Sequence, residues 1–309
     1  MELIELNREE YSNLLKNPFT VFDTIEFSEL NKNKVESLTY ASFYNGKNRF
    51  GLTFGIRDGV LLAPFSAPYV CFSSITKNNK VEAYSEACEI LVKYARKKGL
   101  KKVKLTLPPL VYDNDHITKL YNSLYTCGFK IIGCDINYHY DLCDFNEKYI
   151  SNIVPQARQK LKNALANNLV FEKTDNIELA YRIIRQNRED KGYPLWMSLN
   201  DIYKTIQVVR ADFFIVYDQE ANPIASSMVY HVTDEHVQVI YWGNISNTDH
   251  LRPMNFISFK TFEYYKKYNI KFVDIGPSTE FSIPNLGLCD FKQSIGCKTS
   301  PKFTFEMDI

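Results

Sequence analysis

The chain has 309 residues, of which 45% are hydrophobic and 24% charged, a composition typical of a globular protein and not of a disordered one. Its 37 basic side chains nearly balance the 36 acidic ones, so the net charge of +1 excludes a polybasic coat for nucleic acids. No apolar run reaches the roughly 18 residues that a membrane span needs, and the start "MELIELNREE" lacks a secretion signal, so we expect no membrane span and a cytoplasmic location.

The first half of the sequence alternates helical and strand patterns. Helical periodicity marks "REEYSNLLK", "KVEAYSEACEILVKYARKK" and a segment near 114–127. Strand patterns mark "LTYASFYN", "RFGLTFGI", "VLLAPF", "KVKLTL" and the alternating "FKIIGCDINYHYDL". Several successive strands with helices between them predict an α/β fold in which helices cover a mixed sheet.

The second half shows the same order. A basic helical segment at 147–168 comes first, and helices near 176–190 and 199–209 follow it. Next come the strands "DFFIVYD", "PIASSMVYHV" and "EHVQVIYWGN". A helix near 252–268, the strand "KFVDIG", a short helix in "GLCDFKQSIGC" and the strand "KFTFEM" complete the chain.

Two pairs of segments are near-duplicates. "YARKKGLKKVKLTLP" aligns with "YYKKYNIKFVDIGP" at a shift of 170 residues (264 − 94). "HITKLYNSLYTCGFKIIG" aligns with "LGLCDFKQSIGCKTSPKFTF" at a shift of 168 (296 − 128). Because the order and the shift agree, we predict tandem copies of one unit. The expected domains are 1–146 and 169–309, with 147–168 as the connecting helical segment.

This order of elements resembles the GNAT acyltransferase fold. Two such units in tandem, with "GLCDFKQSIGC" near the end, resemble the Fem-type transferases, which add amino acids to peptidoglycan precursors. The resemblance covers most of the chain, and the sequence supports it best at 240–300, where "YWGN", "YYKKYNIKFVDIG" and "FKQSIG" follow the order of the family. It implies two tandem GNAT-like domains, each a mixed β-sheet flanked by helices, with a catalytic C-terminal domain.

The resemblance also implies a donor site. In GNAT enzymes the fourth strand of the sheet diverges from the fifth, and exposed backbone groups hold the acyl donor. Trp242, Gly243 and Asn244 would line that gap, with Ser278 on its other side. Backbone amides facing a reacting carbonyl stabilise a developing oxyanion.

The loop that follows, "GNISNTDHLRPMN", departs from the pattern of acetyl-CoA-dependent members, because it lacks their glycine-rich phosphate loop. Arg252 and free amides of this loop remain candidates to bind an anion. The donor is therefore either an acyl-CoA or an aminoacyl-tRNA, and we expect no tightly bound cofactor. Against a tRNA donor, the chain has no room between 190 and 199 for the long helical arm of some Fem-type members.

Lys292 lies beside the apolar stripe of its short helix, formed by Leu288, Phe291 and Ile295. The Fem-type pattern places a lysine at this position and implies that it faces the transfer site. There its ammonium would neutralise a phosphate oxygen or a tetrahedral oxyanion. The alternative is that the alkyl chain covers apolar surface while the amine reaches solvent.

Four further residues are candidates for substrate contact. Asp274, at the end of a strand expected to be buried, would contact substrate or orient an amine, or would instead fix the following loop. Tyr193 and Trp196 would stack on a sugar or base of the acceptor, or pack between two helices. Glu280 is a candidate general base, although an ammonium acceptor can lose its proton without one.

Cysteine and histidine residues give no metal signature. Seven cysteines form no CxxC pair, so we interpret them as free thiols, with a disulfide or a zinc site as the alternative. His231 and His236 bracket an expected solvent-exposed turn and lack a third ligand, so we expect no metal site.

The sequence therefore predicts an enzyme that moves an acyl or aminoacyl group from an activated donor to an amine. The acceptor would be a small molecule or a glycan or peptide precursor, such as a cell-wall precursor or an amino sugar, and charged tRNA is a candidate partner. One alternative is an acyl-CoA-dependent N-acetyltransferase of a small amine. Another is a non-catalytic binding module built from degenerate copies. The oligomeric state is left open.

Overall fold

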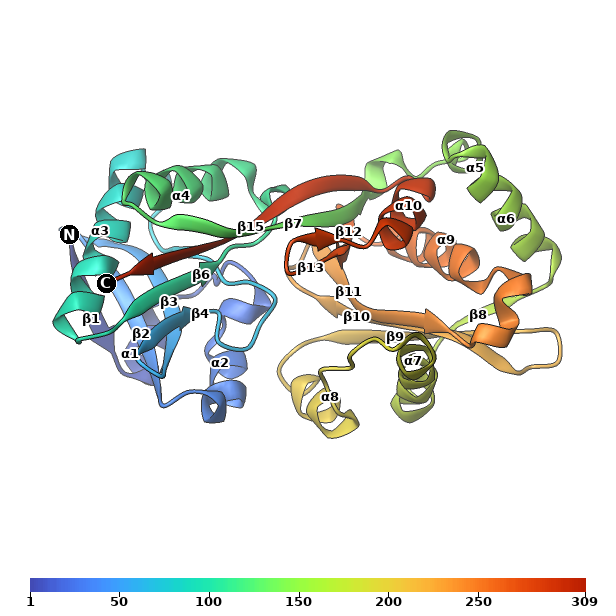
Figure 1. Cartoon of the computed structure of the whole chain (residues 1–309), viewed down its shortest axis with the longest axis horizontal. Coiled ribbons are helices and arrows are strands. Elements are labelled where there is room, and N and C mark those ends of the chain that lie inside the picture. Colours follow the sequence, from blue (N-terminus) through green and yellow to red (C-terminus); the bar gives the residue numbers. More distant parts are fainter. The chain divides into compact units, whose positions relative to one another are not determined.

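The computed structural model describes the whole chain, Met1–Ile309. It divides into two compact units, which Figure 1 shows with their helices and strands labelled. Unit 1 comprises Met1–Ile136 together with Ser300–Ile309, and unit 2 comprises Asn137–Thr299. These bounds differ from the expected ones in two respects: the last strand mostly belongs to unit 1, and the segment 147–168 is part of unit 2.

Strand pairing explains the first difference. Thr304–Asp308, at the end of the chain, pair antiparallel with Lys102–Thr106 in unit 1. The strand that ends the first half of the sequence instead supplies its last residues, as far as Asp141, to unit 2, where they pair with the strand that begins at Phe272. Each half of the sequence therefore completes its sheet with a strand from the other half. A pattern read along the chain cannot show such an exchange.

The second difference has its cause in helix burial. The helix from Pro155 to Ala166 buries Ala157, Leu161 and Ala164. Ala164 joins a core cluster with Phe256 and Ile257 of unit 2. The segment is thus part of the packed core, because its small and apolar side chains recur at helical spacing.

Unit 1 is a mixed sheet with helices on its faces (Figure 1). Its strands run in the order β1-β2-β3-β4-β6-β15, with β5 paired to β3, and only the β4–β6 pair is parallel. The strands are β1 (Glu2–Leu6), β2 (Ser37–Tyr44), β3 (Asn48–Arg57), β4 (Val60–Ala63), β5 (Ser73–Ser74), β6 (Lys102–Thr106) and β15 (Lys298–Asp308). The helices are α1 (Arg8–Leu14), α2 (Ile25–Asn31), α3 (Val81–Lys97) and α4 (Asn114–Thr126).

Unit 2 has the strand order β7-β12-β11-β10-β9-β8, and only the β11–β12 pair is parallel. Its strands are β7 (Lys130–Asp141), β8 (Val170–Lys173), β9 (Ala211–Tyr217), β10 (Pro223–His231), β11 (His236–Asn244) and β12 (Phe272–Pro277), with the hairpin β13 (Thr279–Glu280) and β14 (Ile283–Pro284). Its helices are α5 (Tyr149–Asn152), α6 (Pro155–Ala166), α7 (Ile177–Lys191), α8 (Leu199–Thr205), α9 (Pro253–Lys266) and α10 (Leu286–Ser294). In Figure 1, α6 and α9 lie on one face of this sheet, and α7 and α8 on the other.

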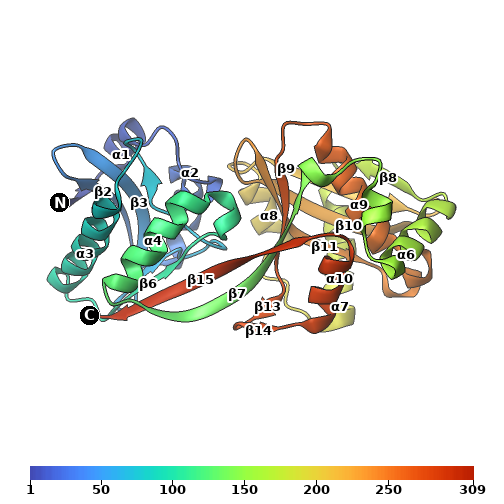
Figure 2. The same cartoon turned by 90° about the horizontal axis from the view of Figure 1, so that it is seen from above.

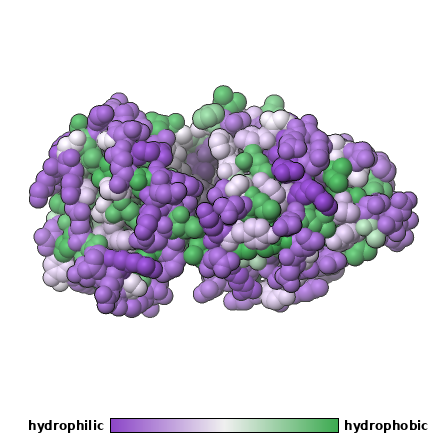
Figure 3. Space-filling view, turned by 90° about the horizontal axis from the view of Figure 1, so that it is seen from below, coloured by the Kyte–Doolittle hydropathy of each residue, from purple (hydrophilic) through white to green (hydrophobic).

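The surface is mostly hydrophilic on the face drawn in Figure 3, with smaller hydrophobic patches between polar residues. None of the helices is long and apolar enough to cross a membrane. All seven cysteines are free thiols. The two histidines expected in an exposed turn are instead largely covered: His231 pairs with Asp212 at 2.7 Å, and His236 stacks on Phe272.

Candidate functional site

Strands β11 and β12 diverge within unit 2. They pair at only three positions, the last being Gln238 with Asp274. Beyond this point β11 continues along β10 as far as Asn244, and β12 continues along β7 as far as Pro277. We call the opening between them the fork. It is the divergence that the GNAT resemblance implied, and it leaves backbone groups of both strands outside a sheet ladder.

A β-bulge shapes the β12 side of the fork. The register between β12 and β7 shifts between Asp274 and Pro277, and Gly276 takes a φ of +71°, which favours glycine. The amide of Gly276 donates to Oδ1 of Asp274 at 2.8 Å. The same oxygen accepts from Nδ2 of Asn137, also at 2.8 Å. The bulge thus fixes the fully buried Asp274 and turns the next carbonyls away from the ladder.

Lys292 binds those carbonyls. Its Nζ donates to the carbonyl of Gly276 at 2.8 Å and to that of Pro277 at 3.0 Å, and it lies 5.4 Å from the centroid of the Tyr138 ring. The side chain is only 4% exposed, so the alternative of an amine in solvent is wrong. An ammonium carries three donors, and two are used here, which leaves one N–H for a ligand.

Burial changes the acidity of this amine. Desolvation lowers the pKa of Lys292 to about 8, the negative charge of Asp274 opposes that shift, and the positive charge of Arg188 adds to it. The lysine is therefore mostly protonated at neutral pH and becomes neutral above pH 8. A desolvated ammonium next to an open strand edge can stabilise a negative charge that forms during a reaction.

The β11 side of the fork is held by α7. Nδ2 of Asn187 donates to the carbonyl of Asn244 at 2.7 Å. A Cβ on Gly243 would come within 2.4 Å of the Asn187 side chain, so only glycine permits this approach. Asn244 donates through Nδ2 to Asp249 at 2.6 Å, which occupies its side chain within the following loop. Trp242 packs edge-on against Phe291 of α10, next to Lys292.

Tyr193 and Trp196 meet in one open pocket of ≈450 Å³ beside α7, together with Arg185 and Arg188. Trp196 is 81% exposed, so it does not pack between helices. The Tyr193 hydroxyl accepts from Nδ2 of Asn285, at the start of α10, at 3.2 Å. These two predicted acceptor residues therefore lie together, and Tyr193 contacts the residue that precedes α10.

Arg188 is the main residue that the sequence analysis missed. Its guanidinium carbon lies 5.3 Å from the Tyr241 ring centroid and 5.9 Å from that of Tyr193. Its guanidinium forms no hydrogen bond or ion pair, and its Nε is buried without a partner. Burial lowers the pKa of Arg188, although this group stays charged. An unpaired, partly desolvated cation in a pocket is a candidate anion site.

Three predicted residues remain. Glu280 is exposed on β13, where it pairs in register with Ile283 of β14. Arg252 is exposed at the start of α9 with a φ of +59°. Ser278 is 2% exposed, and its Oγ has no partner. Figure 2 shows α10 and the hairpin β13–β14, the two elements that follow the bulge.

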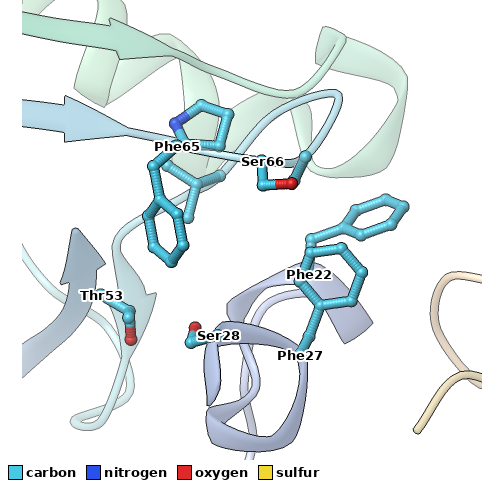
Figure 4. A pocket seen from close by; sticks show the side chains of 9 residues that line it. Phe22, Phe27, Ser28, Thr53, Phe65 and Ser66 are labelled. Carbon is cyan, nitrogen blue, oxygen red and sulfur yellow. The ribbon is translucent and has the colours of Figure 1, made fainter. Parts of the chain in front are cut away.

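Unit 1 has a small apolar pocket. Phe22, Phe27 and Phe65 surround it, and Figure 4 shows their rings around the space, with Ser28 and Thr53 at its edge. The space is ≈10 Å³, about the volume that a single water needs. This part of unit 1 is therefore core, not a substrate site.

No protein-family model and no curated protein matches the chain. Solved structures do match it. FemX aligns with a TM-score of 0.72 and 12% identity, over 100% of this chain and 98% of that chain. L-PGS from Bacillus licheniformis aligns with a TM-score of 0.59 and 12% identity, over 97% and 92%.

A tandem GNAT protein from the clavulanic acid biosynthesis pathway aligns with a TM-score of 0.50 and 11% identity, over 99% of this chain and 98% of that chain. Identities this low are evidence for the fold alone. The chain therefore has a tandem GNAT fold, which it shares over its whole length with FemX, and this confirms the fold predicted from its sequence.

Proposed function

We propose that the protein is an acyltransferase that forms an amide between an activated acyl or aminoacyl donor and an amine. The observation that carries the proposal is the buried ammonium of Lys292 on the bulge of an open fork. The shared fold with FemX supports the reaction class. The donor would lie along the unpaired edge of β11, near Trp242 and Gly243.

The reaction needs charge stabilisation more than a dedicated base. The neutral amine attacks the donor carbonyl, and a C–N bond forms as the carbonyl oxygen becomes negative. The third N–H of Lys292 would stabilise that oxygen. The C–O or C–S bond to the donor then breaks, and the proton of the amine leaves to the departing group or to water. Glu280 has no part in this scheme.

The pocket at Arg188 would bind the acceptor. A guanidinium without a partner is best explained by an anionic group on the substrate, a phosphate or a carboxylate. The rings of Tyr193 and Trp196 in the same pocket suit a sugar or a base attached to it. We therefore favour a charged precursor, such as a cell-wall precursor or a phosphorylated amino sugar, over a simple uncharged amine.

The donor is either an aminoacyl-tRNA or an acyl-CoA. Both carry phosphates that the exposed Arg252, at the start of α9, could contact. The missing glycine-rich loop favours the tRNA donor. A shift in the melting temperature with acetyl-CoA, but not with charged tRNA, would instead favour the acetyltransferase alternative.

A direct test is the substitution Lys292→Ala. We expect it to lower kcat about 10²–10³-fold, the usual effect of removing one oxyanion donor, in an assay that detects amide product by mass spectrometry with each donor class. Lys260→Ala is the control, because Lys260 lies on α9, where it pairs with Glu263 and lies over the rings of Phe256 and Phe259. Unchanged turnover in Lys292→Ala would exclude the proposed role.

A further inference from the structure

Four polar side chains lie next to one another at the base of the fork, and we call them the polar row. Gln238 pairs in register with Asp274, and Asp274 pairs in register with His139. Paired residues of neighbouring strands point to the same face, with Cβ atoms about 5 Å apart. Asn137 lies two residues before His139 on β7, on the same face, and donates to Asp274 at 2.8 Å.

The polar row is buried but not satisfied. Gln238, Asp274, His139 and Asn137 are 4%, 0%, 5% and 1% exposed. Three acceptor atoms in the row have no partner: Oε1 of Gln238, Nδ1 of His139 and Oδ1 of Asn137. Buried polar atoms without partners are uncommon and costly. Three in one row indicate that the site is built for a group that supplies hydrogens.

The chemistry of the row defines that group. Nε2 of His139 lies 3.6 Å from Oδ1 of Asp141, and we place the ring proton on Nε2, toward that carboxylate, which leaves a lone pair on Nδ1. Burial lowers the pKa of His139, so the ring is neutral at neutral pH. The row thus presents three neutral acceptors beside one carboxylate. A primary ammonium matches it, because it has three N–H donors and a positive charge.

We propose that the polar row binds the amino group of a substrate as its ammonium, through Gln238, His139 and Asn137 beside the carboxylate of Asp274. The inference rests on the proposed function and deepens it, because both substrate classes can carry such a group. It is either the α-amino group of an aminoacyl donor or the amine of the acceptor before it loses a proton. Binding at the base of the fork places that amine within the part of unit 2 that holds Lys292.

The first experiment measures binding without turnover. The protein is labelled with ¹⁵N at its five histidines, and the signal of Nδ1 in His139 is assigned by its loss in His139→Gln. Butylammonium chloride should shift this signal as expected when Nδ1 accepts a hydrogen bond. Tetramethylammonium, which has no N–H, should not shift it. Equal shifts with both salts would overturn the proposal. No shift with either salt would also overturn it, and would mean that the row holds water only.

The second experiment uses Gln238→Leu, with Thr261→Val as its control. Thr261 lies on α9, is fully buried and also has an unpartnered hydroxyl. Both variants remove an unsatisfied polar atom, so both should melt at the same or a higher temperature than the wild type. Only Gln238→Leu should weaken butylammonium binding, by about tenfold or more for a lost charged hydrogen bond. Unchanged binding in Gln238→Leu would overturn the proposal.

A third measurement determines whether the bound amine belongs to the donor or to the acceptor. It also separates the ammonium site from the proposed transfer reaction. In the transfer assay, Gln238→Leu should raise KM for the donor if the row holds the donor's amino group, and KM for the acceptor if it holds the acceptor amine. A change in neither KM contradicts the inference. Butylammonium binding without any transfer activity would exclude the proposed function and leave the ammonium site in place. Transfer activity without butylammonium binding would exclude the ammonium site and leave the proposed function in place.

Discussion

The two units share one plan but differ where a substrate would enter. In unit 1, all four residues of β4, Val60–Ala63, pair with β6, and the chain then leaves the sheet. In unit 2, β11 remains beside β10 to its end but parts from β12 after Gln238. The parallel pair is thus closed in unit 1 and open in unit 2. The two units share the fold, and only the second has a parallel pair that separates along its length.

Residues at matching positions of the two units also differ in their chemistry. The shift of 168 residues places Leu124 opposite Lys292 (292 − 168), and Leu124 is fully buried. The shift of 170 places Lys104 opposite Asp274 (274 − 170). Unit 1 therefore has an apolar core residue where unit 2 has a buried ammonium. At this pair of positions, only unit 2 bears the cost of burying a charge.

The strongest test of this difference between the units uses two variants, Lys292→Ala in unit 2 and Leu124→Ala in unit 1. Lys292→Ala should remove most turnover, as stated above, while the folded protein persists. Leu124→Ala should lower the free energy of unfolding by about 2–5 kcal/mol, as expected for a buried leucine, with unchanged kcat per folded molecule. Denaturant unfolding and transfer rates measure both. Lost turnover in folded Leu124→Ala would mean that unit 1 takes part in the chemistry.

Arg188→Ala tests the acceptor side of unit 2. Because the guanidinium would pair with an anion, its loss should raise KM for an anionic acceptor by about 10–100-fold, the range for a hydrogen bond to a charged group, with little change in kcat. Arg185→Ala is the matched control, since Arg185 lines the same pocket but is exposed and pairs with Glu189. Equal effects of the two variants would contradict a specific role for Arg188.

The pH dependence of transfer should depend on Lys292. Its pKa of about 8 is lowered relative to the free side chain, so the required protonated form is present below pH 8 and is lost above it. We expect kcat to fall about tenfold per pH unit on the alkaline side. Arginine stays charged, so this fall should move to higher pH in an active Lys292→Arg variant. An identical profile in that variant would assign the titration to another group.

The lowered pKa of Lys292 also affects the stability of the fold, but here a rise in pH is favourable. Between pH 8 and the pKa of an unfolded lysine, near 10.4, the unfolded chain binds more protons than the folded one. The free energy of unfolding should therefore gain a favourable contribution from this residue as the pH rises through that window. Urea unfolding of the wild type and of Lys292→Met should show the contribution in the former only.

The smallest expected effect is that of Gly276→Ala. At a φ of +71° an alanine costs about 1–3 kcal/mol, and it would disturb the carbonyl that Lys292 binds. Gly46→Ala in unit 1 is the control, because Gly46 has a φ of +67° and open space around it. Both variants should lose similar stability, but only Gly276→Ala should lose activity. Equal activities of the two variants would mean that the reaction does not depend on the bulge.

The sequence predicted the fold well, because the repeat of helices and strands is local and occurs twice. It also placed Lys292 on the right side of its helix, where the structure buries it. It did not predict the exchange of end strands, since pairing of Thr304–Asp308 with Lys102–Thr106 depends on contacts about 200 residues apart. The short elements β1 and α2 were missed because a few residues carry too little periodic signal.

The candidate site was predictable only in part. Tyr193 and Trp196 were chosen by residue type, and their role stays a prediction. Arg188, at the basic end of a helix, looks like an ordinary surface charge until its missing partner is seen. The polar row joins Gln238 to His139 through strand register, which a single sequence does not contain. Glu280 was chosen for its chemistry; the structure places it exposed on β13, and its role as a base stays a prediction.

Hydrogen exchange of the two parallel strand pairs tests the central difference most directly. Alternate amides of β11 beyond Gln238 should exchange quickly in the free protein and slow on addition of a donor, either acetyl-CoA or charged tRNA. The amides that join β4 to β6 should be protected in both conditions. Protection along β11 before any donor is added, or protection by the donor in unit 1 only, would contradict an open donor site in unit 2.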